Sequence, residues 1–306
     1  MTTKTGVVVM AYGTPGSAEE IEPYYTKIRH GHAPTPELLA DLVRRYEAIG
    51  GISPLSELTA AQVAGIARTL DAVHPGVYEV AFGAKYTAPY VEDGVAALSH
   101  CTRIIGIVLT PHQASLGSEQ YHERARTEAE RLGATYVPVT HFYDLDSFAE
   151  IQATRLTAAL AKLPASANGS TMVAFTAHSL PEKILELGDP YPSQVAESGA
   201  MIAKAAGVTD FLIAWQSAGR TRDPWIGPSI LEILPALQHE GTTHLVVCPV
   251  GFVADHLEVL YDLDIEADNA ANELGLHLSR TASLNADQDF LDVLVEAIVR
   301  ADQQRD

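Results

Sequence analysis

The chain has 306 residues, of which 47% are hydrophobic, and its formal net charge is −19. So acidic a chain disfavours binding to nucleic acid, whose phosphates need a basic footprint, and steady attachment to an anionic membrane surface. Its two cysteines, Cys101 and Cys248, are too few for an iron–sulfur cluster, which needs about four cysteine ligands.

The start of the chain and its hydropathy favour a cytoplasmic protein. The first apolar run begins at residue 6, which leaves no room for a signal peptide ahead of it. No apolar run approaches the roughly 20 residues that span a bilayer. We therefore expect a cytoplasmic protein without a membrane span.

Apolar runs alternate with helical patterns along the whole chain. In chain order, strands are expected at residues 6–11, 78–83, 104–110, 135–139, 172–176, 211–215 and 244–249. Helices are expected between and after them, at residues 37–49, 59–73, 118–132, 148–163, 195–206, 228–238 and 287–301. Continuous apolar runs are typical of parallel strands that are buried on both faces. Strands that alternate with helices predict an α/β protein with doubly wound parallel sheets.

The two halves of the chain resemble each other coarsely. Each begins with a strand and then a polar loop that contains proline, at residues 12–15 and at residues 178–181. This pattern predicts two similar lobes that face one another across a cleft. We expect the first lobe at residues 1–142 and the second at residues 143–286, with a last helix within residues 287–306 packing back on the first lobe.

The most informative segment is AHSLPEK, residues 177–183, which directly follows the expected strand at residues 172–176. In an open α/β fold, ligands bind in the crevice beyond the carboxyl ends of the strands. His178 would therefore project its imidazole into that crevice. A neutral imidazole binds metals such as Fe(II) and accepts a proton near neutral pH. By itself, however, a lone histidine is more often structural or simply exposed.

Three acidic residues follow a later expected strand at a spacing of four: Glu258, Asp262 and Glu266. An α-helix keeps this spacing on one face with a drift of about 40° per step, and a π-helical stretch would align the side chains better. A solvated acidic face is the plain alternative. Against it, like charges four residues apart destabilise a helix by roughly a few tenths of a kcal/mol per pair. We therefore expect a path for cations or protons, since carboxylate oxygens bind hard cations such as Mg²⁺.

Further positions could line a ligand cleft. Tyr12 follows the first strand and precedes a glycine, Ser53 follows two glycines, and Trp225 lies in a turn after Asp-Pro. Ordinary packing of Tyr12 and a plain loop at Ser53 are the alternatives. A basic cluster that includes Arg29 and Arg45 could bind an anionic small molecule, although a solvated helix face explains it as well.

Five separated segments, in order along the chain, resemble the ferrochelatase family, which inserts Fe(II) into a porphyrin. They are MAYGTP, YEAIGGISPL, HSLPEK with the following GDPYP, WQS with the following DPW, and PVGFVADHLEVLYD. The resemblance covers nearly the whole chain. It implies two Rossmann-like lobes with a porphyrin cleft between them.

The resemblance also implies roles for individual residues. It matches His178 and Glu258 to the pair at the metal-insertion site, and Tyr12 to the residue that meets iron from the opposite face. Asp262 and Glu266 would continue as an outer path for cations or protons, with Arg45 beside it. The expected substrate-binding residues, which include those that hold propionates, are Arg29, Arg45, Ser53, Tyr121 and Trp225.

The length and motifs resemble the soluble Gram-positive branch of the family, which acts on coproporphyrin III in haem biosynthesis. This implies coproporphyrin III and Fe(II) as substrates, no tightly bound cofactor, and Mg²⁺ as a candidate for the outer acidic site. Coproporphyrin carries four propionates, which suits the basic cluster around Arg29 and Arg45. We expect a monomer that makes transient contact with neighbouring enzymes of the haem pathway. Tyr86 departs from the pattern, because a close relative has histidine there, and its role stays open.

Three alternatives remain at this point. A ferrochelatase for protoporphyrin IX would use the same residues, and a chelatase that inserts cobalt or nickel into sirohydrochlorin would also use histidines and acids. A non-catalytic tetrapyrrole carrier would need the cleft but neither the His178–Glu258 pair nor the acids that follow it. Their joint presence favours the enzyme, and turnover beyond one equivalent would exclude the carrier.

Overall fold

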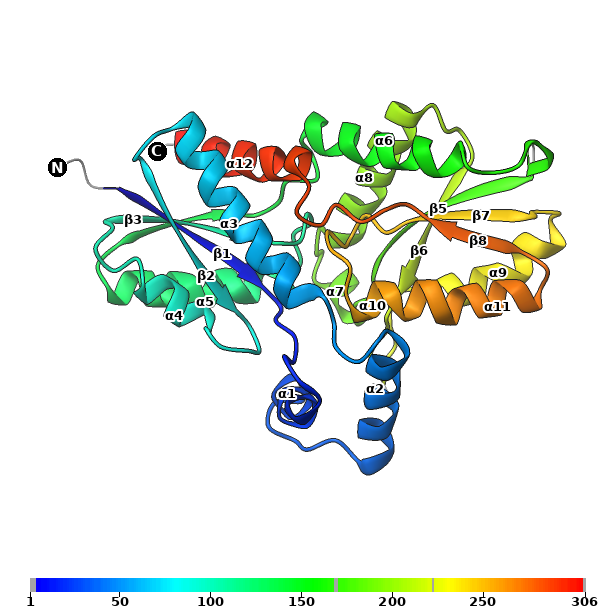
Figure 1. Cartoon of the computed structure of the whole chain (residues 1–306), viewed down its shortest axis with the longest axis horizontal. Coiled ribbons are helices and arrows are strands. Elements are labelled where there is room, and N and C mark those ends of the chain that lie inside the picture. Colours follow the sequence, from blue (N-terminus) through cyan, green and yellow to red (C-terminus); the bar gives the residue numbers. More distant parts are fainter. Residues whose placement is uncertain (1–3, 168–169, 222, 305–306) are drawn as a thin grey trace.

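Two four-stranded parallel sheets organise the chain in the computed structural model, which describes residues 4–167, 170–221 and 223–304 (Figure 1). The first sheet has the strand order β2-β1-β3-β4 and the second the order β6-β5-β7-β8. Counted within its own sheet, each order is second, first, third, fourth, so the two lobes share one topology. The strands are β1 (Thr5–Ala11), β2 (Tyr78–Ala84), β3 (Arg103–Val108), β4 (Thr135–Val139), β5 (Thr171–His178), β6 (Phe211–Gln216), β7 (His244–Cys248) and β8 (His277–Arg280).

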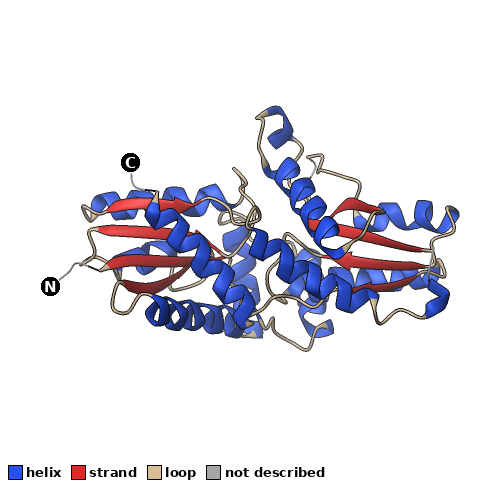
Figure 2. Cartoon of the chain, turned by 90° about the horizontal axis from the view of Figure 1, so that it is seen from above, coloured by secondary structure: helices blue, strands red, loops and turns tan. Residues whose placement is uncertain are grey.

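Helices pack around both sheets, which lie in separate halves of the molecule (Figure 2). Those before the second sheet are α1 (Ile21–Ile28), α2 (Pro36–Ala48), α3 (Leu55–Val73), α4 (Val91–Ala96), α5 (Ser118–Arg131) and α6 (Asp146–Leu160). Those that follow are α7 (Lys183–Glu186), α8 (Tyr191–Ala206), α9 (Ile230–His239), α10 (Leu257–Leu260), the π-helix η3 (Asp262–Ala267), α11 (Asp268–Glu273) and α12 (Gln288–Gln303). Within the described ranges, no helix is both long and apolar enough to cross a bilayer.

Strand β1 illustrates why the buried strands appear as continuous apolar runs. Val7 and Val9 face one side of the sheet, where they pack in a core shared with α3 and α12. Val8 and Met10 face the other side, where α4 and α5 complete a second core. None of these four side chains is exposed, because helices cover both faces of the sheet.

All seven expected strands are present, and the structure adds β8, which the apolar runs did not predict. Strand β8 lies at the edge of the second sheet, with His277 exposed and its other residues only partly buried. An edge strand needs no continuous apolar run, since only part of it is covered. Helices α1 and α4 were not expected either, because they are only eight and six residues long and too short for a clear period.

The last helix, α12, packs on the first sheet. Leu291 lies so close to α3 that a Cβ on Gly65 would come within 2.4 Å of its Cδ1. At the far end of the helix, Asp302 accepts hydrogen bonds from the Tyr78 hydroxyl and from Arg103 Nε, both at 2.9 Å. The chain therefore crosses to the second lobe and returns to the first.

Helix α2 belongs to the first lobe by sequence but contacts the second. Arg44 donates a hydrogen bond of 2.6 Å to the Tyr261 hydroxyl, and Arg220 pairs with Asp41 at 2.8 Å. Figure 1 shows α1 and α2 standing away from the first sheet, with α2 directed towards the second lobe. The α1–α2 segment therefore links the lobes on one side of the molecule.

Candidate functional site

The carboxyl ends of the parallel strands bring most of the candidate residues together. Tyr12 directly follows β1, His178 is the last residue of β5, and Gln216 is the last residue of β6. Residues 249–258 follow β7 and lead into α10. This is the edge at which ligands bind in open α/β folds.

A close approach of two backbones places Glu258 beside His178. A Cβ on Gly251 would lie only 2.6 Å from the Cβ of Ala177, so the loop after β7 needs glycine to lie against the end of β5. The buried Gln216 then donates a hydrogen bond of 2.9 Å from Nε2 to the backbone oxygen of Glu258. These contacts fix the main chain on either side of the pair.

His178 and Glu258 form the centre of the site. His178 Nε2 lies 3.6 Å from Glu258 Oε1, and the two side chains keep 32% and 40% of their surface exposed although both lie deep in the protein. The other ring nitrogen, Nδ1, is hydrogen-bonded to the backbone oxygen of Ser179. Because a carbonyl only accepts, Nδ1 carries a proton and Nε2 is the nitrogen presented to Glu258 and the open space.

The pair is electrostatically matched. Burial alone would lower the pKa of His178, but the Glu258 carboxylate and the Ser179 carbonyl outweigh it, and the pKa is raised from its ordinary value. Burial would raise the pKa of Glu258, but the charges of His178, His256 and Arg45 and the hydrogen bond to His178 lower it to about 2. Glu258 is therefore ionised at neutral pH, and the raised pKa of His178 favours the protonated form of its imidazole.

Aromatic rings flank the imidazole. The centre of the His178 ring lies 6.3 Å from that of Trp225 and 6.4 Å from that of Phe252. His256 packs on Phe252 at 5.0 Å and accepts a hydrogen bond from the Glu258 backbone nitrogen at 3.1 Å. The sequence predicted Trp225 at a cleft, placed His256 after a second strand without giving it a site role, and gave no indication of Phe252. The presence of Phe252 and His256 in the PVGFVADHLE segment beside Glu258 was the only signal.

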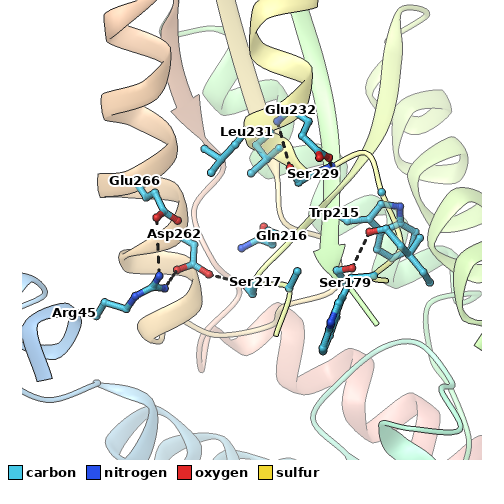
Figure 3. A pocket seen from close by; sticks show the side chains of 15 residues that line it. Arg45, Ser179, Trp215, Gln216, Ser217, Ser229, Leu231, Glu232, Asp262 and Glu266 are labelled. Carbon is cyan, nitrogen blue, oxygen red and sulfur yellow. Dashed lines mark hydrogen bonds and ion pairs between the residues drawn. The ribbon is translucent and has the colours of Figure 1, made fainter. Parts of the chain in front are cut away.

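The three acids at a spacing of four, Glu258, Asp262 and Glu266, are called the acid ladder below. The ladder continues from α10 onto a π-helix, η3, which begins at Asp262. Arg45 Nη1 lies 3.1 Å from Asp262 Oδ1, and Arg45 Nη2 lies 3.9 Å from Glu266 Oε1 (Figure 3). The Ser217 hydroxyl donates to Asp262 Oδ2 at 2.5 Å. Burial, followed by the charge of Glu258, outweighs these partners and raises the pKa of Asp262 to about 6. Asp262 can therefore gain and lose a proton close to neutral pH.

A cavity of roughly 420 Å³ opens beside these acids. Its lining includes Ser179, Gln216, Trp225, Glu232 and Glu266, and Figure 3 shows Arg45 reaching into it from α2. Arg45 also pairs with Asp41 at 3.1 Å. Its guanidinium is thus held by carboxylates of the protein, within the acid ladder.

Tyr12 is the candidate site residue of the first lobe, where it directly follows β1. Its ring is 41% exposed and lies 4.8 Å from the ring of Tyr86 and 6.5 Å from that of Tyr24. Burial within the site and then the negative charge of Glu258 raise the pKa of Tyr12. The charge of Glu258, from the second lobe, thus contributes to the raised pKa of Tyr12 in the first lobe.

The remaining expected binding residues lie on three other elements of the first lobe. The Nε of Arg29, at the end of α1, is buried and has no partner among the described residues. Ser53 is 4% exposed and its Oγ accepts a hydrogen bond from the Leu55 nitrogen at the start of α3, which leaves the hydroxyl proton free to be donated. Tyr121 is buried on α5, and burial raises its pKa.

In the part of the chain that the structure describes, no three histidine, cysteine or acidic side chains are close enough together to hold a metal ion. His178 and Glu258 can supply two metal ligands or a proton acceptor with an anionic partner.

Comparison with known proteins gives a consistent result. The family model described as Ferrochelatase matches residues 4–302. The coproporphyrin III ferrochelatase of Bacillus subtilis is 42% identical over 302 residues, which is 97% of this chain and 97% of that protein. The coproporphyrin III ferrochelatase of Listeria innocua is 42% identical over 299 residues, with coverage of 96% and 97%.

Two solved structures share the fold. SirB from Bacillus subtilis with Fe³⁺ has a TM-score of 0.61 at 14% identity, and each chain is covered to 99%. CbiX, the terminal enzyme for siroheme biosynthesis in denitrifying bacteria, has a TM-score of 0.52 at 13% identity, with 97% of this chain and 99% of that chain covered. These similarities confirm the expected two-lobed α/β architecture.

Proposed function

The chain belongs to the ferrochelatase family, and on that basis we propose that it inserts Fe(II) into coproporphyrin III. The products are Fe-coproporphyrin III and two protons, and the reaction is a step of haem biosynthesis. The observation that carries the proposal is the partly exposed His178–Glu258 pair at 3.6 Å, beyond the carboxyl ends of β5 and β7. The curated relatives at 42% identity support the choice of porphyrin.

His178 and Glu258 would act on the metal and on the protons that it displaces. The Ser179 carbonyl keeps the proton on Nδ1, so a neutral His178 presents the lone pair of Nε2. That lone pair can hold Fe(II) beside the macrocycle or accept a pyrrole proton. The Glu258 carboxylate stabilises the imidazolium that forms, because it is ionised throughout the neutral range.

The acid ladder would carry protons out or cations in. Asp262, with a pKa of about 6, can hold a proton in transit. Glu266 is 40% exposed and lies at the outer end, where it can exchange with solvent. Arg45 lies between these two carboxylates and limits their mutual repulsion. We also propose that Mg²⁺ can occupy this outer acidic site, since carboxylates are the ligands that it prefers.

The macrocycle would lie between the lobes, with Trp225 near the His178 side and Tyr12 on the opposite side. Arg29, Ser53 and Tyr121 would hold propionates, and the unpartnered buried Nε of Arg29 supports its part in this. Binding of these remote groups can be used to bend the ring and expose the pyrrole nitrogens, which lowers the barrier to insertion.

We further propose that the first lobe spans residues 1–142 and the second residues 143–286, with residues 287–306 returning to the first. The protein is proposed to be a cytoplasmic monomer with no tightly bound cofactor. It is proposed to make transient contact with neighbouring haem-pathway enzymes.

Anaerobic insertion assays with coproporphyrin III and protoporphyrin IX in parallel test the function. Loss of free-porphyrin fluorescence reports the reaction, and we expect many turnovers with a large preference for coproporphyrin III in kcat/KM. Preference for protoporphyrin IX would overturn the substrate. No more than one equivalent of product with either would overturn the enzyme and favour a carrier.

A further inference from the structure

A partly buried lysine beside the site lacks a carboxylate partner. Lys85 directly follows β2, and its Nζ lies 5.0 Å from the centre of the Tyr121 ring and 5.3 Å from that of Tyr86. Nζ donates a hydrogen bond of 2.6 Å to Gln120 Oε1. Within the described residues, no carboxylate lies within the 4.0 Å of an ion pair with it. An ammonium has three N–H donors, so this neighbourhood leaves it under-satisfied.

The carboxylate of Glu92 is engaged by Arg124. Glu92 accepts hydrogen bonds from Arg124 Nε at 2.7 Å and from Arg124 Nη2 at 2.6 Å, so both of its oxygens are engaged. Arg124 also donates to the backbone oxygen of Lys85 at 3.0 Å, which keeps a second positive charge close by. Gln120 lies in the first turn of α5, and the amino end of a helix is itself positive.

The result is a local excess of positive charge in a chain whose net charge is −19. A partly buried cation without a counter-ion is costly. Burial, together with the charge of Arg124, lowers the pKa of Lys85 to about 8. An anion placed against Nζ would supply the missing charge and hydrogen bonds.

Ring contacts connect Lys85 to Tyr12, the first-lobe residue at the candidate site. The ring of Tyr86, on which its Nζ lies, is 4.8 Å from the ring of Tyr12. The charge of Glu258 contributes to the raised pKa of both Tyr12 and Tyr121. A ligand held in the cleft can therefore extend a flexible acidic side chain towards Lys85.

We propose that Lys85 binds a carboxylate of the tetrapyrrole substrate, between the rings of Tyr86 and Tyr121. This assignment rests on the proposed function, because it takes the ligand to be a porphyrin with several propionates. It makes Lys85 a substrate-binding residue that contributes to affinity rather than to the chemical step.

The test compares coproporphyrin III binding without iron, measured by fluorescence, in the full-length protein and three variants. Lys85→Met removes the charge at similar length, Lys85→Arg retains it, and Lys204→Met is the matched control. Lys204 is an exposed lysine in the last turn of α8, which precedes β6 and so lies at the opposite end of the second sheet. We expect about a tenfold weaker Kd for Lys85→Met, near-wild-type binding for Lys85→Arg within about threefold, and no change for the control.

Two further readouts separate substrate binding from a structural role. In the insertion assay, Lys85→Met should raise KM and leave kcat within about twofold. Its Tm without porphyrin should not fall, because the substitution removes an uncompensated charge. Binding of Lys85→Met within twofold of wild type would overturn the proposal, as would a fall in Tm with no rescue by Lys85→Arg. If the wild-type protein binds coproporphyrin III but inserts no iron, the proposed function fails, whereas the Kd comparison still decides on Lys85.

Discussion

The two lobes have the same strand order but carry opposite chemistry at their strand ends. The second lobe presents His178, Glu258 and Asp262, an imidazole and two carboxyl groups, for which we propose cation binding and proton transfer. The first lobe presents Tyr12 and Lys85, a ring and a positive charge. Residues beyond the strand ends are not part of the apolar core, so they can differ while the strands that support them stay alike. One topology can therefore carry two different sets of side chains at its strand ends.

Removing the imidazole of the second lobe should have the largest effect. We expect His178→Ala to lower kcat about 10³-fold, since it removes both the proton acceptor and a metal ligand. The Kd for coproporphyrin III should stay within about threefold, because the residues proposed to hold the propionates, Arg29, Ser53 and Tyr121, lie on the first lobe. The control is His277→Ala, at an exposed position in the edge strand β8. Insertion of iron by His178→Ala at a near-wild-type rate would show that the second lobe does not carry the chemical step in the way we propose.

Glu258→Gln should lower kcat about 10²-fold and also move the pH profile. The Glu258 charge raises the pKa of His178 against the opposing effect of burial, so its loss lets that pKa fall. His178 would then be neutral at lower pH. The acid limb of kcat/KM against pH should shift to lower pH, and an unshifted limb would mean that a group other than His178 controls it.

Asp262→Asn should lower kcat about tenfold, because the proton path loses a group that titrates near neutrality. It should also change the dependence of stability on pH. A carboxyl with a raised pKa favours the folded state at low pH, and this contribution is lost as the pH rises from about 4 to about 6. Denaturant unfolding at several pH values should show that the free energy of unfolding falls less between about pH 4 and pH 6 in the variant than in the wild-type protein. An identical pH dependence in both proteins would contradict the raised pKa.

The smallest effect on activity should come from the contact that ties α12 to the first lobe. Asp302→Ala removes the acceptor for Tyr78 and Arg103, and we expect about 2 kcal/mol less stability in urea unfolding. The values of kcat and KM should stay within about twofold, because α12 lies behind the first sheet. A large loss of kcat would mean that α12 also positions the site.

The sequence predicted the sheets better than the helices and edges around them. Strands such as β1 and β7 are covered on both faces, so each appears as an uninterrupted apolar run. Strand β8 and helix α4 are short, and β8 is only partly covered. Neither therefore has a hydrophobic pattern long enough to predict it from the local sequence. The π-helix was anticipated because three acids at a spacing of four align better on it than on an α-helix.

The motifs led to the residues of the pair, but not to the residues that support it. Gln216 holds the backbone of Glu258 from a different strand, and Ser217 holds the side chain of Asp262. Arg45 was expected both to serve an anionic substrate and to lie beside the outer acids, and it lies among three carboxylates of the protein, Asp41, Asp262 and Glu266. These contacts join residues far apart in the sequence, so the spacing of residues within a motif does not predict them.

The sequence by itself determined the family, the alternation of strands and helices, and the residues at the strand ends, because each follows from a local motif or period. Only the tertiary structure decided which charged side chains pair with one another and how their pKa values shift. Among the described residues it left Lys85 without a carboxylate within ion-pair distance, it placed Arg45 beside Asp262, and it raised the pKa values of His178 and Asp262. Burial and distance set these properties, and both depend on how the two lobes and α2 come together.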